Sequence, residues 1–396
     1  MAEWIECKIS DIGTVVGGAT PSTKKAENYE GGNIAWITPK DLSTFSGRYI
    51  QRGERNITEI GLKSCSTQLL PENTVLFSSR APIGYVAIAA NEVCTNQGFK
   101  SVIPNEATDP LFLFYLLKHN KDKIEAMGSG TTFKEVSGNT MKNIIVRVPS
   151  DKEVQKNIAS ILGTLDDKIE ENERINNNLL EQVLTLYRNR FVDTVNNERR
   201  ICRADEYFDI SIGKTPPRKE PQWFSTNPQD VTWVSISDMG TCGLYIGSSS
   251  EQLTKEAVDR HNVKIVPDNT VLLSFKLTVG RIAITNGEMT TNEAIAHFKT
   301  DKKEINEYLY CYLKCFNYQT MGSTSSIATA VNSKIIKGMP FVVPTDDELI
   351  DFHSVAAPMF AKIKANQTES EKLTAVRDTL LPKLMSGELD VSDIDL

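Results

Sequence analysis

The fold is decided by Leu70-Pro71-Glu72-Asn73-Thr74-Val75-Leu76-Phe77-Ser78, a stretch that the chain contains twice. The second copy is Val266-Pro267-Asp268-Asn269-Thr270-Val271-Leu272-Leu273-Ser274, at an offset of 267 − 71 = 196 residues. Because self-similarity over a fixed offset reports a repeated structural unit, this stretch predicts two copies of one half.

The repeat extends in both directions from this stretch. Downstream, Gly84-Tyr85-Val86-Ala87-Ile88 matches Gly280-Arg281-Ile282-Ala283-Ile284, and Thr95-Asn96 matches Thr291-Asn292. Upstream, Thr20-Pro21 matches Thr215-Pro216, and Trp36 with Asp41 matches Trp233 with Asp238. So many ordered matches establish a duplication, with small insertions between the copies.

Each copy contains both strands and helices. Runs rich in β-branched residues and bounded by turn residues predict strands at 74–77, 85–89, 270–274 and 281–285. Asp109-Pro110 is typical of a helix start and predicts a helix over 111–124, matched by one from about 305 to 316. The predicted fold class is α+β, with two repeated mixed α/β domains.

A long helix is predicted after each domain. Val148-Pro149 is followed by a capping box from Ser150 to Glu153, and Val343-Pro344 by one from Thr345 to Glu348. Spacings of three and four then give a mostly apolar seam with a polar centre in both helices. The predicted seams are Ile158, Ile161, Leu165, Lys168, Asn172, Ile175, Leu179, Gln182, Leu186 and Phe352, Val355, Met359, Lys362, Asn366, Glu369, Leu373, Val376, Leu380.

These two seams predict an antiparallel intramolecular coiled coil, because each must be buried against a partner. Asn172 and Asn366 would then lie near one another at the centre and fix the register of the pair. The alternative is that both asparagines sit just off the seam in water. A helix of about 40 residues spans about 60 Å, so the pair would act as a spacer between the domains.

Composition limits the class of protein. The 396 residues, 40% of them apolar, suffice for two or three domains, and no run approaches a membrane span of about 20 apolar residues. The start Met1-Ala2-Glu3-Trp4-Ile5-Glu6 lacks the order of a signal peptide, which favours the cytoplasm. A net charge of −7 excludes a globally basic surface, so nucleic-acid binding would need local basic patches.

Signatures of catalysis and of metal binding are incomplete. The seven cysteines and four histidines lack the spacing of a zinc site. Gly213-Lys214-Thr215 resembles the end of a phosphate-binding loop, but Phe208 stands where that loop needs its first glycine. We therefore predict a binding subunit that is not an enzyme and holds neither a metal nor a cofactor.

The chain resembles the specificity subunits of type I restriction-modification systems over nearly its whole length. The likeness rests on the repeated stretch with its Gly-x-Val/Ile-Ala-Ile continuation, on Gly17-Gly18-Ala19-Thr20-Pro21-Ser22, on Thr95-Asn96-Gln97-Gly98, and on the ending 380–389. It implies target recognition domains at 1–149 and 195–344, a central long helix at 150–194, and a C-terminal long helix and tail at 345–396. The second copy departs from the first at Asn292-Glu293-Ala294 and Ser274-Phe275-Lys276.

This resemblance implies a function and partners. Each domain would read one half of a bipartite site in double-stranded DNA, and the helices would set the spacer. Two methyltransferase subunits using S-adenosylmethionine, and restriction subunits that translocate with ATP and Mg and cut, would supply the catalysis. Two alternatives are a protein-binding adaptor with duplicated domains, and the specificity chain of a fused restriction-methylation enzyme.

Reading DNA requires cations for phosphates and short polar side chains for base edges. Loops of that content give the predicted contacts Thr20, Ser22, Lys24, Lys25, Arg80, Ser129, Thr131, Thr132, Lys134, Lys214, Thr215, Arg218, Lys219, Lys276, Ser323 and Ser325. Arg80 and Lys276 could reach guanine, although an arginine or lysine that opens a tight turn is more often a solvated surface group. Thr95-Asn96 and Thr291-Asn292 are predicted to form turns rather than to read bases.

Overall fold

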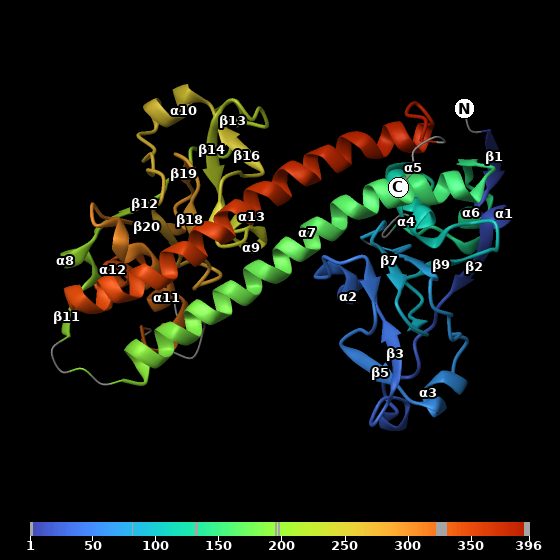
Figure 1. The fold of residues 1–396 in the computed structure, drawn as a ribbon, viewed down its shortest axis with the longest axis horizontal. Helices are drawn as coiled ribbons and strands as arrows, with labels where there is room; N and C mark the ends of the chain where they lie inside the picture. The colour runs from blue at the N-terminus through green and yellow to red at the C-terminus, as the bar shows by residue number, and fades with distance from the viewer. Residues whose placement is uncertain are drawn as a thin grey trace. The chain divides into compact units, whose positions relative to one another are not determined.

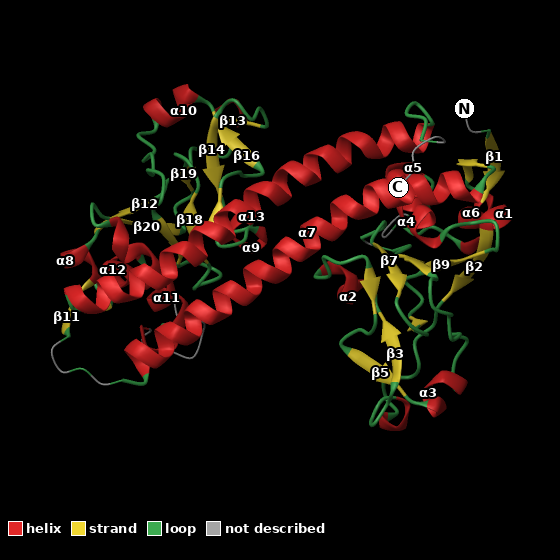
Figure 2. Ribbon diagram, viewed as in Figure 1, coloured by secondary structure: helices red, strands yellow, loops and turns green. Residues whose placement is uncertain are grey.

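The computed structural model describes residues 3–80, 82–130, 134–194, 196, 199–321 and 331–391. The chain forms two compact units, Met1–Glu170 with Glu371–Leu396 (unit 1) and Glu171–Ser370 (unit 2). Figures 1 and 2 show that each unit combines a mixed α/β domain with segments of the same two long helices. The predicted α+β fold is confirmed.

Unit 1 contains three sheets. The strand orders are β2-β9-β6-β7-β4, β5-β3-β8 and β1-β10. The strands are β1 Trp4–Lys8, β2 Gly13–Gly17, β3 Ile34–Ile37, β4 Tyr49–Ile50, β5 Arg55–Ile57, β6 Val75–Phe77, β7 Val86–Ala89, β8 Cys94–Thr95, β9 Lys100–Pro104 and β10 Ile145–Pro149. The β3-β8 and β4-β7 pairs are parallel, and the other pairs are antiparallel.

Unit 2 repeats this topology with one added strand. Its strand orders are β12-β20-β17-β18-β15, β13-β16-β14-β19 and β11-β21, and β14-β19 and β15-β18 are again parallel. The strands are β11 Arg200–Arg203, β12 Asp209–Ile212, β13 Phe224–Ser225, β14 Val231–Val234, β15 Tyr245–Ile246, β16 Glu251–Leu253, β17 Val271–Ser274, β18 Ile282–Thr285, β19 Thr290–Thr291, β20 Ile295–Lys299 and β21 Pro340–Val343. The duplication read from the sequence is therefore a duplication of fold.

The repeated stretch forms the same turn and central strand in both units. Asn73 and Asn269 adopt left-handed conformations, with φ of 67° and 53°, immediately before the buried strands β6 and β17. Asparagine tolerates this conformation better than most residues, which explains its place in the motif. The four predicted strands are confirmed to within a residue or two.

The shorter helices cover the sheets. In unit 1 they are α1 Ile9–Ile12, α2 Pro39–Ser43, α3 Glu59–Lys63, α4 Pro110–His119, α5 Lys121–Ala126 and α6 Gly138–Asn143, with a 3₁₀ turn at Ala26–Asn28. In unit 2 they are α8 Ala204–Tyr207, α9 Asp238–Thr241, α10 Lys255–Arg260, α11 Asn306–Cys315 and α12 Ser333–Lys337, with 3₁₀ turns at Pro221–Trp223, Lys303–Ile305 and Tyr318–Met321.

The predicted helix over 111–124 is wrong in one respect, since it is two helices. Asn120 ends α4, and its side-chain amide donates to the carbonyl oxygen of Leu116 at 2.8 Å, competing with the main chain. The start is as predicted, because Asp109 accepts a hydrogen bond from the Phe112 amide. The matching helix α11 confirms its prediction.

The long helices are α7 Lys152–Tyr187, which continues as a π-helix over Arg188–Val192, and α13 Asp346–Ser386. The capping box at the start of α13 is confirmed, with Thr345 N donating to Glu348 at 3.0 Å and Glu348 N donating to Thr345 at 3.3 Å. The predicted box at Ser150 is wrong. Its hydroxyl donates to the Glu3 carbonyl oxygen, and Asp151 caps the Glu153 amide instead.

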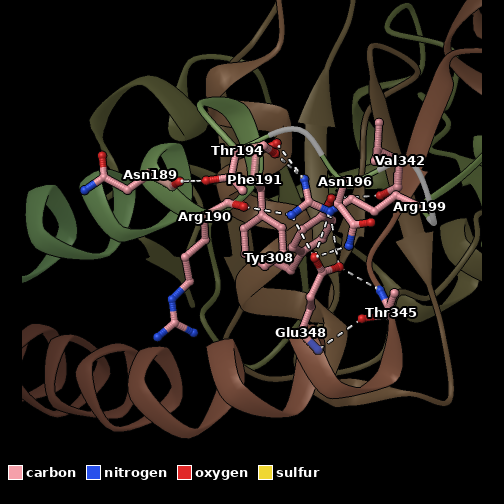
Figure 3. Close-up of polar contacts among 10 residues, drawn as sticks. All are labelled: Asn189, Arg190, Phe191, Thr194, Asn196, Arg199, Tyr308, Val342, Thr345 and Glu348. Carbon is pink, nitrogen blue, oxygen red and sulfur yellow. Dashed lines mark hydrogen bonds and ion pairs between the residues drawn. The ribbon is translucent and has the colours of Figure 1, made fainter.

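Glu348 also takes part in a contact between the start of α13 and the end of the π-helix that follows α7. Figure 3 shows Arg199, which precedes β11, donating to the Glu348 carboxylate and to the carbonyl oxygens of Arg190, Phe191 and Thr194. The Arg199 to Glu348 ion pair measures 2.8 Å, and the Arg199 side chain is 7% exposed. One buried guanidinium thus ties the end of the π-helix to the first turn of α13.

Within each unit the segments of α7 and α13 run antiparallel. In unit 1, Asp166 of α7 contacts Arg377 of α13, and Asn157 contacts Val391, which lies just beyond the end of α13. In unit 2, Asn172 bonds to Ser370, and Asn176 to Asn366. Residue numbers that rise along α7 meet numbers that fall along α13, as predicted.

The predicted seam of α13 is only partly correct. Val355, Lys362 and Val376 are exposed, and the buried face instead contains Phe352, Ala356, Phe360, Ile363 and Asn366. These residues belong largely to the cluster that also includes strands and helices of the unit 2 domain. Because α13 packs against its domain as well as α7, its buried face is displaced from the predicted seam.

Candidate nucleic-acid interface

Three loops meet at the same place in each unit. They are the Thr-Pro loop (18–25 in unit 1, 213–219 in unit 2), the Asn turn (95–98, 291–294) and the serine loop (78–80 with 82–85, and 274–281). All three connect to strands of the sheets, and together they carry most of the predicted DNA contacts. They form the candidate interface.

In unit 1 the Thr-Pro loop lies directly on the Asn turn. A Cβ atom on Gly18 would stand 2.2 Å from the Thr95 carbonyl oxygen, so only glycine allows this approach. Ala19 N donates to the same oxygen at 3.0 Å, and the Trp36 indole donates to the Ala19 carbonyl oxygen at 3.2 Å. The Thr20 hydroxyl then donates to the side chain of Gln97.

The serine loop of unit 1 approaches the Asn turn from the other side. Ser79 N donates to the Gly98 carbonyl oxygen at 2.7 Å. The next residue, Arg80, pairs with Glu135 at 3.0 Å, and Glu135 also pairs main chain to main chain with Ser129. Burial alone would raise the pKa of Glu135, but Arg80 and Lys100 lower it overall. Thr20, Arg80 and Ser129, far apart in sequence, therefore belong to one bonded cluster.

Unit 2 reproduces this framework with different functional groups. A Cβ on Gly213 would lie 2.1 Å from the Thr291 hydroxyl, Lys214 N donates to Thr291 O at 2.9 Å, and the Trp233 indole donates to Lys214 O at 3.2 Å. The Thr215 hydroxyl donates to Glu293, the residue that corresponds to Gln97. The same scaffold thus presents an amide in unit 1 and a carboxylate in unit 2.

Positive charges surround the Glu293 carboxylate. Partial burial would raise its pKa, but the Thr215 hydroxyl, Lys276 and Arg218 lower it overall. Arg218 is held by Glu251 at 2.8 Å, and its guanidinium lies over the rings of Phe224 and Trp233, at 4.2 and 4.7 Å. This arginine is preorganised at the loop surface.

A serine bridge holds the serine loop in both units. The Ser78 hydroxyl donates to Pro82 O and accepts from Tyr85 N, and the Ser274 hydroxyl donates to Thr278 O and accepts from Arg281 N. In unit 2 this bridge presents Leu277, which is 100% exposed and left-handed, with φ of 61°. A large apolar side chain therefore projects from a strained loop tip.

The Asn turns are turns, as predicted. Asn96 accepts a hydrogen bond from Gly98 N at 2.9 Å, and Asn292 accepts one from Ala294 N at 3.1 Å. Their side chains are therefore occupied in shaping the loop.

The other predicted contacts are placed as follows. Lys25 forms an ion pair with Glu27 at 3.6 Å, and Lys276 lies over the Phe275 ring at 5.9 Å. The exposed predicted residues are Thr20, Ser22, Lys24, Lys25, Arg80, Ser129, Lys134, Lys214, Arg218, Lys219 and Lys276. Thr131, Thr132, Ser323 and Ser325 lie outside the described residues.

The predicted register residues are both buried in unit 2, where Asn172 is 0% and Asn366 1% exposed. The Asn172 amide donates to the Asn366 carbonyl oxygen, to Glu369 and to Ser370, and the Asn366 amide donates to Asn176. The polar centre expected from the two seams therefore exists as a bonded group.

Sequence reasoning missed Gln97, Glu293, Glu135 and Leu277 as residues of the candidate interface. Gln97 and Glu293 had a readable signal, since they differ at one matched position inside an otherwise repeated turn. The partnership of Glu135 with Arg80 depends on tertiary contact, and the exposure of Leu277 depends on the turn geometry.

Neither a metal site nor a membrane helix is evident in the described ranges. Among these residues no group of three or more histidine, cysteine or acidic side chains is arranged to hold a metal ion. None of the helices there combines the length and apolar content required to cross a bilayer.

Comparison with known proteins places this architecture in a family. The family model described as "Type I restriction modification DNA specificity domain" matches residues 1–181 and 200–374. The type I restriction enzyme MjaIX specificity subunit of Methanocaldococcus jannaschii is 35% identical over 421 residues, which cover 99% of this chain and 95% of that protein. The HindI specificity subunit of Haemophilus influenzae is 21% identical, covering 98% of this chain and all of that protein.

A solved structure shares the fold. The type I restriction-modification S subunit from M. genitalium superposes with a TM-score of 0.56 at 17% identity, covering 97% of this chain and 96% of that one. These matches confirm the resemblance seen in the sequence, and the chain belongs to the family of type I restriction-modification DNA specificity domains.

Proposed function

We propose that this chain is the non-catalytic DNA-recognition subunit of a type I restriction-modification complex, and that each domain reads one half of a bipartite target. The observation that carries this is the matched pair Thr20 with Gln97 and Thr215 with Glu293. Two copies of one rigid loop framework present different base-reading groups at the same position. That is what two different half-sites require.

The chemistry of the matched pair fits recognition in the major groove. An amide such as that of Gln97 can both donate and accept, which suits the edge of adenine, whereas a carboxylate such as Glu293 accepts only and suits the cytosine amino group. The surrounding exposed cations, Lys24 and Lys25 in unit 1 and Lys214, Arg218 and Lys219 in unit 2, suit phosphates. The polar and cationic groups of each interface thus have separable roles.

The names of the relatives, which are specificity subunits of restriction enzymes, support an assembly of this chain with other subunits. We assign methylation of adenine with S-adenosylmethionine to two modification subunits, and translocation and cleavage with ATP and Mg to restriction subunits. The long helices set the spacer and dock the modification subunits. A specificity chain of a fused restriction-methylation enzyme would share this surface and differ in its partner.

The net charge of −7 supports weak binding by the chain alone. Because the chain is not basic overall, we expect its affinity to come partly from partner chains that enclose the DNA. We expect the purified chain to bind DNA weakly at moderate salt.

Genome-wide mapping of adenine methylation tests the function. Cells carrying this subunit with its modification partner should show a split motif with an unread centre, and deletion of this chain should abolish it. Methylation that is unchanged by the deletion would contradict the proposal.

Charge reversal then tests the interface. Lys24→Glu with Lys25→Glu should weaken methylation governed by the first half-site by about tenfold or more, since each lost phosphate contact weakens binding. The matched control is Lys63→Glu with Lys142→Glu, two exposed lysines of unit 1 outside the three loops. Equal losses in both variants would remove Lys24 and Lys25 from the interface.

A further inference from the structure

A buried polar cluster joins three elements of unit 1. The Tyr115 hydroxyl on α4 donates to Asp166 Oδ2 on α7 at 2.6 Å, and Arg377 on α13 donates to Asp166 Oδ1, also at 2.6 Å. Tyr115 is 0% and Asp166 5% exposed. One carboxylate therefore links the recognition domain to both long helices.

A second buried cation reinforces this junction. Arg48, in the residue before β4, donates to the Gly163 carbonyl oxygen at 3.3 Å and to Glu170 at 3.0 Å, and it also pairs with Asp167. Burial raises the pKa of the Tyr115 hydroxyl, and the positive charge of Arg48 opposes this effect. The unit 1 domain is thus fixed to α7 by the buried guanidinium of Arg48, whose partners Glu170 and Asp167 are 36% and 70% exposed.

The same four positions in unit 2 are apolar. With the domain offset of 196 and the helix offset of 366 − 172 = 194, the counterparts of Arg48, Tyr115, Asp166 and Arg377 are Leu244, Cys311, Phe360 and Val183. All four are buried in one hydrophobic cluster. The ring of Phe360 meets that of Tyr310 edge-on, with centroids 5.7 Å apart. Arg48, Tyr115, Asp166 and Arg377 are therefore all replaced by apolar groups in the second junction.

This difference bears on which helices can pair. If α7 paired antiparallel with another copy of α7, Asp166 would face Val183 and lose Arg377. If α13 paired with another α13, Arg377 would face Phe360. Either self-pairing buries a charge opposite an apolar side chain, which is strongly unfavourable. Only α7 with α13 matches charge with charge at one junction and apolar groups with one another at the other.

We propose that these two unlike junctions form a pairing code, which makes each half of the duplicated chain select the other half and reject a copy of itself. Because the halves descend from one unit, their helices would otherwise be able to self-pair. The code keeps two different domains on one helix pair, and so keeps a target with two different halves. This proposal concerns the pairing of the two helices and not the reading of DNA. It can therefore be tested without DNA.

The test uses the full chain, cut once after folding. A protease site is inserted between Asn197 and Glu198, and two preparations carry different tags at both their N-termini and their C-termini. The cut proteins are mixed in mild denaturant and returned to buffer. Affinity capture with mass spectrometry then counts pairs of two N-terminal halves. The exchange of C-terminal halves between the two preparations is the control for mixing. Mixing is complete when this exchange reaches the level expected for random pairing.

The wild-type chain should form N-terminal self-pairs at less than about a tenth of the statistical level, because self-pairing leaves a buried charge unpaired. Asp166→Phe with Arg377→Val gives unit 1 the two helix residues found at the matching positions of unit 2, and should raise self-pairing at least about tenfold. Arg174→Val, which breaks the exposed ion pair with Glu171 on α7, is the matched control and should leave pairing unchanged.

A second pair of variants guards against misfolding. Asp166→Asn with Arg377→Met keeps the shapes and the Tyr115 hydrogen bond, removes both charges, and should raise self-pairing in the same direction. In the uncut chain, Asp166→Phe alone should lower Tm by about 10 °C, and adding Arg377→Val should recover much of this loss. Wild-type self-pairs at the statistical level, or a charge-free chain that still avoids self-pairing, would overturn the proposal. Either result would leave the DNA-recognition function unaffected.

Discussion

The side-chain amide of Asn172 donates a hydrogen bond to the main-chain carbonyl oxygen of Asn366, 3.4 Å away inside unit 2. The two residues are equivalent in the duplicated sequence and meet in a buried position. Asn172 Oδ1 accepts no hydrogen bond from the described residues. The centre of the helix pair is therefore polar and incompletely satisfied, which favours a role in register over a role in stability.

Replacing both asparagines by leucine should stabilise the chain while weakening its register. We expect Asn172→Leu with Asn366→Leu to raise the free energy of unfolding by about 1 kcal/mol, because a buried unsatisfied acceptor is removed and apolar contact is added. Urea denaturation measures this. Asn177→Leu, at an exposed position of α7, is the control and should change little. A large loss of stability in the double variant would show that the asparagines stabilise the pair.

Acid should weaken the junction between Arg199 and Glu348. The Arg199 guanidinium lowers the pKa of Glu348 to about 2, outweighing the opposing effect of burial, with further help from Asn196 and the Thr345 amide. Since the folded-state pKa lies below the unfolded value, this stabilisation is present above about pH 4.5 and is lost as the pH falls towards 2. Glu348→Gln should cost about 2–3 kcal/mol at pH 7 and flatten the stability profile below pH 4.5.

The control for this experiment is Glu371→Gln, an exposed position on the same helix. Urea denaturation at several pH values measures both variants. An acid profile of Glu348→Gln that matches the wild type would show that Arg199 does not hold the carboxylate in the folded chain.

His297 should remain neutral in the folded chain at mildly acidic pH. It is fully buried between the hydroxyls of Ser211 and Thr291, at 3.0 and 2.7 Å, and burial lowers its pKa to about 3, with a contribution from Lys299. The unfolded chain takes up this proton near pH 6.5, so stability falls as the pH drops from 6.5 towards 3, by about 2 kcal/mol at pH 5. Nitrogen chemical shifts that report a charged His297 ring at pH 5 would contradict this.

Glycine at position 277 should relieve the backbone strain at the tip of the serine loop in unit 2. Leu277 is fully exposed in a left-handed conformation, so Leu277→Gly loses no burial and removes the strain on Cβ. We expect the free energy of unfolding to rise by about 1 kcal/mol. Leu277→Ala keeps the strained backbone and should leave stability unchanged in the same thermal melts. A loss of DNA-directed methylation in both variants would show that the side chain, and not the backbone strain, serves the interface.

The sequence by itself determined the duplication, the fold class and the antiparallel helix pair. These follow from local chemistry that repeats at a fixed offset. Pro-x-Asn-Thr forms a left-handed turn before a buried strand wherever it occurs, and a helix with an apolar face needs a partner. Asn172 and Asn366 could be predicted to meet because antiparallel pairing of equivalent helices brings equivalent central residues together.

Tertiary structure alone decided which side chains share a surface and which faces are buried. Val355 fits a heptad by spacing but is exposed, because α13 buries Phe352, Ala356 and Phe360 in the core of the unit 2 domain instead. Glu135 meets Arg80, and Asp166 meets Tyr115 and Arg377, only when distant elements pack together. Contacts of this kind depend on how distant elements pack and on where their side chains point. The order of polar and apolar residues along the chain does not contain this information.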